Sequence, residues 1–146
     1  MAKNRKPNMM LQGKRSFEKE NPDSYFQKNP VWSFKWIDKD HPRWSLKVQN
    51  NLYENVILKL KDYEGLTWAE INKASGGRTY GTNSHYEDVE DLCKDARDRI
   101  NELMIFEDRV FSLRLDGETR LYGIIENGVF YVIWYDPNHE IYPVKK

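Results

Sequence analysis

The strongest constraint on the fold lies in the last third of the chain, where apolar residues alternate with polar ones and two turn signals interrupt them. The predicted strands and turns are 110–115, Asp116-Gly117, 119–125, Asn127-Gly128 and 129–135. Asp-Gly and Asn-Gly pairs favour the tight turns of hairpins, because these turns require positive φ angles. The pattern therefore predicts an antiparallel meander, followed by a turn at 136–138 and a short strand through Ile141 and Tyr142.

Segments with helical spacing precede the meander. Apolar side chains between 44 and 63 recur three or four residues apart, which predicts an amphipathic helix. Thr67 and Glu70 have the spacing of a capping box, so a short helix is predicted to follow them. A further helix is predicted over 86–104. The predicted fold class is α+β: helices followed by a C-terminal antiparallel β-meander packed on the 86–104 helix.

The N-terminal part divides into a polar arm and a strand. Residues 1–28 show no apolar periodicity and start with a run of basic residues, so they are predicted to form a mobile basic arm. Residues 29–146 are predicted to form a single α+β domain. Three aromatic residues alternate with polar ones over 31–37 and are predicted to face the core from a strand: Trp32, Phe34 and Trp36.

Composition argues against several classes of protein. Five Trp and nine Tyr are too many for a disordered chain, and the apolar runs are too short to span a membrane. The single cysteine, Cys93, excludes an internal disulfide, and with no secretory signal in view the expected location is the cytoplasm. Three histidines lack a second ligand at metal-binding spacing, so no metal or other cofactor is expected: His41, His85 and His139.

Charge is unevenly distributed although the net charge is zero. Residues 1–61 hold 13 Lys or Arg against 6 Asp or Glu, whereas residues 86–108 hold 9 acidic against 3 basic residues. A basic half suits a nucleic acid, and an acidic segment suits a basic partner. The alternative is that both runs are simply solvated faces.

Strand alternation gathers polar side chains on one face of the meander. Arginines neutralise a phosphate and the developing charge of its transition state, and a histidine or tyrosine can move the proton of a 2′-hydroxyl. Such a surface suits RNA cleavage without a metal. The alternative is an ordinary solvent-facing sheet with scattered polar residues. The side chains in question are Ser112, Arg114, Arg120, Tyr122, His139 and Tyr142.

The C-terminal part resembles the RelE/YoeB-like toxin superfamily of bacterial endoribonucleases. The resemblance lies in an amphipathic helix followed by "SLRLDGETRLYGIIENGVFYVIWYDPNHEIYP". It implies catalytic roles for Arg120, His139 and Tyr142, and substrate binding by Arg114 and, as a weaker match, Lys145. The ending "YVIWYDPNHEIYP" is also similar to that of an uncharacterised group of bacterial proteins often carried near mobile elements.

Two functional hypotheses follow. In the first, the chain is a RelE-like endoribonuclease toxin of a toxin-antitoxin or mobile-element system, acting on free or ribosome-associated RNA. Arg78 and His85, from the glycine-bearing loop 76–85, are then expected to help bind substrate, and a cognate antitoxin protein is the expected partner. In the second, the same scaffold is a non-catalytic module that binds nucleic acid or protein. Neither hypothesis involves a membrane.

Overall fold

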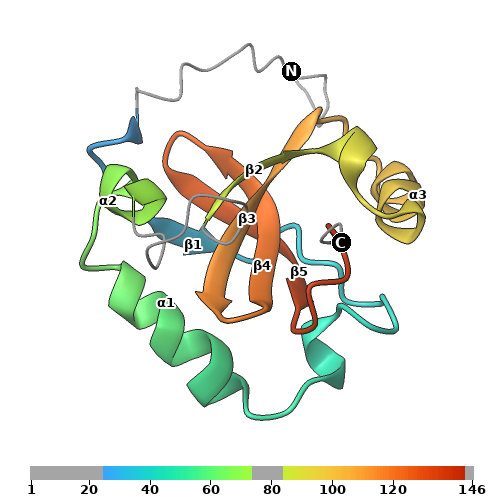
Figure 1. Ribbon diagram of the computed structural model, residues 1–146, viewed down its shortest axis with the longest axis horizontal. Helices are drawn as coiled ribbons and strands as arrows, with labels where there is room; N and C mark the ends of the chain where they lie inside the picture. Colours follow the sequence, from blue (N-terminus) through green and yellow to red (C-terminus); the bar gives the residue numbers. More distant parts are fainter. Residues whose placement is uncertain (1–24, 74–83, 144–146) are drawn as a thin grey trace.

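Five strands form one sheet in the computed structural model of the protein, which describes residues 25–73 and 84–143 (Figure 1). The strand order is β1-β5-β4-β3-β2, with β1 parallel to β5 and every other pair antiparallel. The predicted meander and the α+β class are therefore confirmed. The strands are β1 (Val31–Ser33), β2 (His85–Asp88), β3 (Arg109–Asp116), β4 (Thr119–Glu126) and β5 (Val129–Asp136).

The predicted turn at Asn127-Gly128 has the expected backbone geometry, whereas at the predicted turn Asp116-Gly117 the first residue still belongs to β3 and only Gly117 has a positive φ. Asn127 and Gly128, between β4 and β5, have φ angles of 55° and 87°, and Gly117, between β3 and β4, has a φ of 36°. A side chain at Gly128 would be strained in this conformation, which glycine adopts at no steric cost. Turn chemistry thus sets which strands of the meander are neighbours.

A bulge interrupts the pairing of β4 with β5 between Tyr122 and Gly123. A Cβ atom added at Gly123 would lie 2.1 Å from the backbone oxygen of Tyr131, so only glycine fits there without a backbone shift. The bulge also places two successive residues, Ile133 and Trp134, against the same apolar cluster. It therefore changes which β5 side chains face each layer.

Helices cover both faces of the sheet, and two apolar clusters fill the spaces between them (Figure 1). One face packs on a continuous helical segment and a second short helix, and we call it the α1 face. The other face packs on α3, and we call it the α3 face. The helices are η3 (Tyr53–Ile57, a π-helix), α1 (Leu58–Tyr63), α2 (Trp68–Lys73) and α3 (Lys94–Glu102), with 3-10 turns η2 (Leu46–Val48) and η4 (Val89–Asp91).

The capping box before α2 is present as predicted. The Thr67 amide donates to the Glu70 carboxylate at 2.9 Å, and the Glu70 amide donates to the Thr67 hydroxyl at 3.2 Å. This exchange satisfies two amides that the helix itself leaves unbonded. It directs Trp68, which is fully buried, into the cluster on the α1 face.

Two predicted elements have different bounds, and a third does not form within the described residues. The helix expected over 86–104 starts only at Lys94, because residues 85–88 pair with β3 and so extend the sheet. The helix expected over 44–63 is preceded by a loop and the 3-10 turn η2. No strand forms at 141–142 within the described residues, because the amides of Glu140 and Ile141 bond the Asp136 carboxylate and close a turn instead.

The N-terminal predictions also need correction. Tyr25, which was assigned to the mobile arm, is 2% exposed and belongs to the apolar cluster on the α1 face, so the folded domain includes it. Residues 1–24 lie outside the described residues. The strand at 31 spans three residues only, and Phe34 lies beyond its end with 44% of its surface exposed. Of the three aromatic residues, Trp32 packs against the core, and Trp36 instead stacks on Tyr131.

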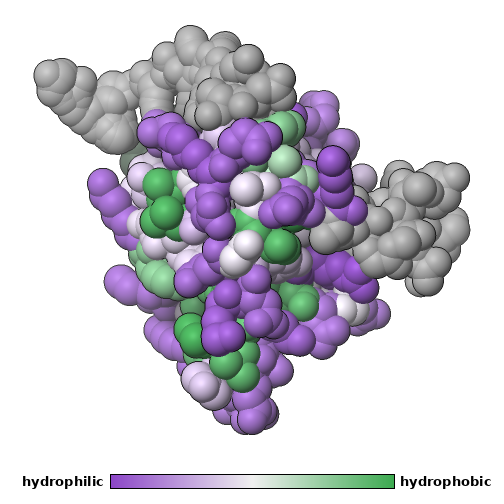
Figure 2. Space-filling model, turned by 90° about the vertical axis from the view of Figure 1, so that its left-hand side faces the viewer, coloured by the Kyte–Doolittle hydropathy of each residue, from purple (hydrophilic) through white to green (hydrophobic). Residues whose placement is uncertain are grey.

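The outer surface on the α1 side is mostly hydrophilic, with small separate apolar patches (Figure 2). Tyr53 and Ile57 are exposed on the outer side of η3, at 65% and 49%. Among the described residues, no helix has the length and apolar character that crossing a membrane requires.

Candidate functional site

The α3 face carries two kinds of side chain. Its central part is apolar and packs on α3, whereas polar side chains gather toward the end of the sheet where β3 turns into β4. Cross-strand pairing assigns the polar residues to this face, since paired residues project to the same side. We call this set the polar cluster and add to it His139, whose charge acts on the neighbouring Asp136. The paired residues of the cluster are His85, Glu87, Ser112, Arg114, Arg120, Tyr122 and Asp136.

Two arginines face each other in the outermost row of the polar cluster. Arg114 on β3 pairs directly with Arg120 on β4, and Arg120 pairs in turn with Asp136 on β5. Like charges opposite each other in a sheet are destabilising, so this pair is costly for the fold alone. Asp136, beside Arg120, is the one opposite charge among the residues paired in this row.

The two arginines differ in their surroundings. Arg120 is 2% exposed, and its Nη1 donates to the backbone oxygen of Gly117 at 2.6 Å and to that of Thr119 at 3.2 Å. Burial, together with the charge of Arg114, lowers the pKa of Arg120. Arg114 is only half-buried. Arg120 therefore braces the β3–β4 turn, while Arg114 is the more accessible cation.

Asp136 organises the turn that follows β5. Its carboxylate is fully buried and accepts hydrogen bonds from the amides of Glu140 at 3.0 Å and Ile141 at 2.8 Å. Burial raises the pKa of Asp136, and the three amides that it contacts and the nearby charge of His139 act in the opposite direction. The turn holds His139 at a φ of 60°, a conformation that is uncommon for a residue with a side chain. The hydrogen bonds of Asp136 therefore determine the conformation of the turn and, with it, the position of His139.

Tyr122 lies at the centre of the polar cluster. It is 1% exposed, it pairs with Ser112 on β3 and Trp134 on β5, and burial raises its pKa. Within the described residues its hydroxyl makes no hydrogen bond of good geometry, although Ser112 lies opposite. The same holds for Arg114 Nε and His139 Nδ1. Buried polar atoms of native proteins nearly always have partners, so a water molecule or a ligand atom is expected beside each of these three atoms.

His85, which the sequence analysis named, lies in the second row, and beside it lies Glu87, which the sequence analysis missed. His85 Nε2 lies 2.6 Å from the Glu87 carboxylate, which is 7% exposed. Both residues belong to β2 and project to the α3 face, because they pair with Ser112 and Val110 of β3. Residues 86–93 were predicted as helix, whereas His85 and Glu87 lie two residues apart on one face of a strand. A strand prediction at 85–88 would have found Glu87.

Tyr142 lies at the far side of this arrangement from Arg120. It packs against the apolar cluster of the α3 face, and the charge of Glu87, followed by burial and the charges of Asp91 and Asp88, raises its pKa. Tyr142 therefore keeps its proton at neutral pH. Of the residues predicted from sequence, Arg120 and His139 lie beside Asp136, and Arg114 lies next to Arg120 on the adjacent strand. His85 is one row away, and Tyr142 is close enough to Glu87 to respond to its charge. Arg78 and Lys145 lie outside the described residues.

A network of charged residues fixes the turn onto the rest of the domain. Arg43 contacts both Glu140, at 2.9 Å, and Asp95 of α3. Beside it, Asp38 accepts two hydrogen bonds from Arg99 and one from Trp134, each at 2.8 Å. Burial opposes ionisation of Asp38, yet these bonds outweigh it and lower its pKa to about 2. The turn that carries His139 is thus held from the side of α3.

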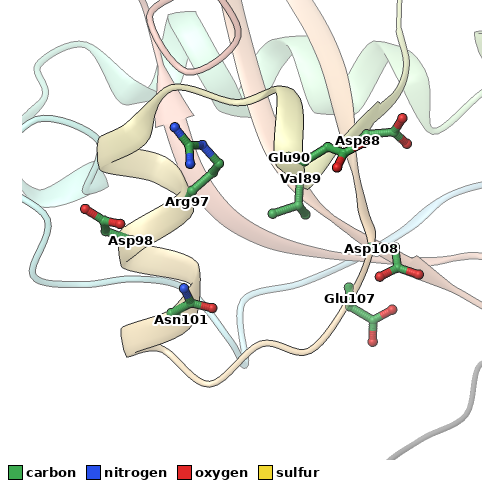
Figure 3. A pocket seen from close by; sticks show the side chains of 8 residues that line it. All are labelled: Asp88, Val89, Glu90, Arg97, Asp98, Asn101, Glu107 and Asp108. Carbon is green, nitrogen blue, oxygen red and sulfur yellow. The ribbon is translucent and has the colours of Figure 1, made fainter.

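A separate cleft of about 510 Å³ lies between α3 and the end of β2 (Figure 3). Five carboxylates line it around one arginine, so it repels a polyanion and does not suit RNA. Within the described part of the chain no group of acidic, His or Cys side chains has the arrangement of a metal site. The lining residues are Asp88, Val89, Glu90, Arg97, Asp98, Asn101, Glu107 and Asp108.

A comparison of the chain with protein families, curated proteins and solved structures found no significant match.

Proposed function

We propose that this chain is an endoribonuclease of the toxin type, and that the polar cluster is its active site. The observation that carries the proposal is the facing pair Arg114 and Arg120 beside three buried polar atoms without protein partners in the described chain. A phosphate group would supply acceptor oxygens to Arg114 Nε and the Tyr122 hydroxyl, and would offset the repulsion between the two guanidinium groups.

The two histidines lie on different sides of this anion site. His139 follows the turn from β5, and His85 is on β2, across Ser112 from Tyr122. Two proton-transfer groups flanking a phosphate can perform cleavage by the neighbouring 2′-hydroxyl. One histidine takes the 2′-hydroxyl proton as the O2′–P bond forms, and the other gives a proton to O5′ as the P–O5′ bond breaks. The products are a 2′,3′-cyclic phosphate and a 5′-hydroxyl.

This mechanism predicts which substrates are cleaved. DNA and 2′-O-methyl RNA lack the nucleophile, so both should bind through their phosphates and remain intact. The acidic cleft beside α3 excludes the strand from that side, which leaves the β3–β4 end of the sheet as its path. The single-stranded form is favoured, since a flexible strand can align O2′, phosphorus and O5′.

The test is incubation of the purified protein with a short single-stranded RNA, followed by analysis of the product ends. His139→Asn is the informative variant, because asparagine tolerates the positive φ at this position. Loss of a positioned proton-transfer group should lower the rate by about 10²–10⁴-fold with an unchanged melting curve. Arg114→Ala should weaken RNA binding, whereas Arg97→Ala, in the acidic cleft, is the matched control and should not.

A binding module without catalysis is the second candidate, and the burial of Arg120 favours it. Arg120 is already bonded to the carbonyls of the β3–β4 turn, so it can support an anion site without taking part in a reaction. In that case RNA binds with a dependence on Arg114 but stays uncut. Full cleavage activity in His139→Asn would likewise remove His139 from the mechanism.

A toxin should also stop growth when it is produced in bacteria without an antitoxin. Induction of the wild-type chain should arrest growth and leave new 5′-hydroxyl ends in cellular RNA, while His139→Asn should do neither. Normal growth with intact RNA, at matched protein levels, would contradict the toxin proposal.

A further inference from the structure

His41 begins a single turn between β1 and η2, residues 41–45, which we call the His41 turn, and its ring caps that turn. Nδ1 accepts hydrogen bonds from the backbone amides of Arg43 at 3.1 Å and Trp44 at 3.2 Å. Pro42 takes the first position of the turn, where no amide is needed. Serine, threonine, aspartate or asparagine usually supply the cap. A histidine makes the same bonds with a group that can be protonated near neutral pH.

The two bonds define which form of the ring closes the turn. A ring nitrogen that accepts carries no proton, so the neutral His41 has its proton on Nε2. Protonation would place a second proton on Nδ1, opposite two N–H groups, and both amides would lose their acceptor. His41 is 6% exposed, and its ring stacks on that of Trp44 with the centroids 4.1 Å apart. Water can therefore replace the lost acceptor only if the turn opens.

The His41 turn also supports the segment that follows β5. The backbone oxygen of Trp44 accepts from the amide of Tyr135 at 2.9 Å. Trp44 Nε1 and Arg43 Nη1 both donate to the carboxylate of Glu140, at 3.3 Å and 2.9 Å. Glu140 directly follows His139 in the chain. The conformation of the His41 turn therefore affects how the final turn of the polar cluster is held.

We propose that His41 is an acid-sensitive latch, whose neutral ring holds the His41 turn closed and whose protonation at Nδ1 opens it and frees Glu140 from Arg43 and Trp44. Such a latch couples a local change of charge to the position of a neighbouring segment. It is a property of the fold and does not depend on the proposed endoribonuclease function.

Burial is the main influence on the ionisation of His41, and it lowers the pKa of the ring from its ordinary value of 6.5. Nearby charges act in both directions, since carboxylates favour the imidazolium and guanidinium groups oppose it. From β5 the neighbour is an uncharged ring, that of Trp134. The charged groups that face the ring are Asp38 and Arg43 of the loop after β1, Asp95 and Arg99 of α3, and, through the ring of Trp44, Glu140.

The lowered pKa gives the direction of the effect. In the open state the ring has its ordinary pKa of about 6.5, so the open state binds a proton more tightly than the closed state. The closed state is therefore fully favoured above that pH and loses stability as the pH falls below it. One proton is linked to opening in this range, so the ratio of open to closed molecules rises by up to about tenfold for each pH unit. Asp38, with a pKa of about 2, titrates at lower pH.

The experiment follows hydrogen exchange in the full-length protein by NMR between about pH 7.5 and about pH 5, the range in which histidine titrates. Each rate is divided by the rate of an unfolded chain at the same pH. The reporters are the amide of Tyr135, which bonds the oxygen of Trp44, and the indole N–H of Trp44, which bonds Glu140. Both should exchange faster, by up to about tenfold for each pH unit, as the pH falls below about 6.5.

His41→Asn is the matched variant, because asparagine caps a turn with a side-chain oxygen that does not titrate. In this variant the exchange of both reporters, corrected in the same way, should be independent of pH over the same range. The amide of Trp68, which bonds the oxygen of Lys28 on the α1 face, is the internal control. It should not follow the two reporters in the wild type.

The same pH dependence in His41→Asn as in the wild type would overturn the proposal, because the opening would then have another cause. An equal acceleration at Trp68 would also overturn it, since the whole domain and not the His41 turn would be opening. If His41→Asn does not fold, nitrogen NMR of the wild-type ring decides. Nδ1 should carry no proton at about pH 7.5 and should titrate below about 6.5, whereas a protonated Nδ1 or a higher midpoint would exclude the latch.

Discussion

The two faces of the sheet are formed by side chains of the same three long strands, but they differ in how their polar atoms are bonded. The α1 face is covered by apolar and aromatic side chains, and its few polar atoms are bonded, as in the 2.5 Å hydrogen bond from Tyr63 to the backbone oxygen of Arg114. The α3 face is apolar only where α3 packs on it, and beyond α3 it holds two facing arginines and a tyrosine hydroxyl with no bonding partner among the described residues. Bonded polar atoms thus characterise the α1 face, whereas buried polar atoms without hydrogen bonds in the described chain lie on the α3 face.

Replacing Trp68 tests the first half of this comparison and should have the largest effect on stability. The ring is fully buried, contacts Trp32, Phe111 and Phe130, and donates to the backbone oxygen of Gly128 at 2.9 Å. Trp68→Ala should reduce the free energy of unfolding by about 3–5 kcal/mol, because a large cavity forms. Urea denaturation followed by circular dichroism measures it.

Ile57→Ala is the control for that change, since it truncates an apolar side chain on the exposed side of η3. Its effect should stay within about 0.5 kcal/mol. A small loss in Trp68→Ala would show that the α1 face is not the main source of stability, and the contrast between the faces would fail.

Low pH should reduce the free energy of unfolding through a charged contact on the α3 face. The bonds of Asp38 to Arg99 and Trp134 lower its pKa from 3.8 to about 2 in the folded state. A lowered folded-state pKa contributes stability above pH 4 that disappears as pH falls toward 2, here roughly 2 kcal/mol. The free energy of unfolding of Asp38→Asn should therefore depend less on pH between 4 and 2 than that of the wild type.

Asp40→Asn is the matched control, because the Asp40 side chain is 61% exposed. Asp136 acts with the opposite sign, since its raised pKa favours the folded state at low pH and opposes it as pH rises. The difference between the wild type and Asp38→Asn removes that contribution. Parallel pH profiles for these two proteins would show that Asp38 does not support the fold by its charge.

Much of the fold was predictable because its signals are local. The Asp-Gly and Asn-Gly turns fixed the meander, and the Thr67–Glu70 capping box located α2. The parallel pairing of β1 with β5 joins segments about a hundred residues apart, and no local pattern indicates it. The sequence predicts helix from residue 86 because Val89 and Leu92 extend the apolar stripe of α3. Residues 85–88 instead form a strand because they pair with β3, and this pairing is a tertiary contact.

The candidate site was predicted in part for the same reason. Alternation correctly placed Arg114 with Ser112 and Arg120 with Tyr122 on one face. The burial of Arg120 and the contact between His85 and Glu87 depend on how the final turn and β2 pack, which sequence alone does not give. Turn chemistry indicated His139, but only the Asp136 hydrogen bonds show what holds it.

Removing one tyrosine hydroxyl from each face compares the two faces through a smaller change in stability. Tyr63→Phe deletes a buried hydrogen bond on the α1 face and should cost about 1 kcal/mol. Tyr122→Phe deletes a hydroxyl that bonds nothing in the described chain, so stability should stay the same or rise slightly. RNA binding should weaken only in Tyr122→Phe. If Tyr122→Phe loses stability as Tyr63→Phe does, its hydroxyl has a protein partner and the anion site loses its centre.

The smallest effect is expected at Phe34, where alternation with Trp32 and Trp36 suggested a core position. Its ring is 44% exposed beyond the end of β1, so little apolar surface returns to water when it is truncated. Phe34→Ala should change the free energy of unfolding by less than about 0.5 kcal/mol, whereas a buried phenylalanine would cost about 3–5. Thermal melting of Phe34→Ala beside Phe130→Ala, from the fully buried centre of β5, separates the two cases. A large loss at Phe34 would mean that the strand continues past Ser33 and that its aromatic side chains all face the α1 cluster.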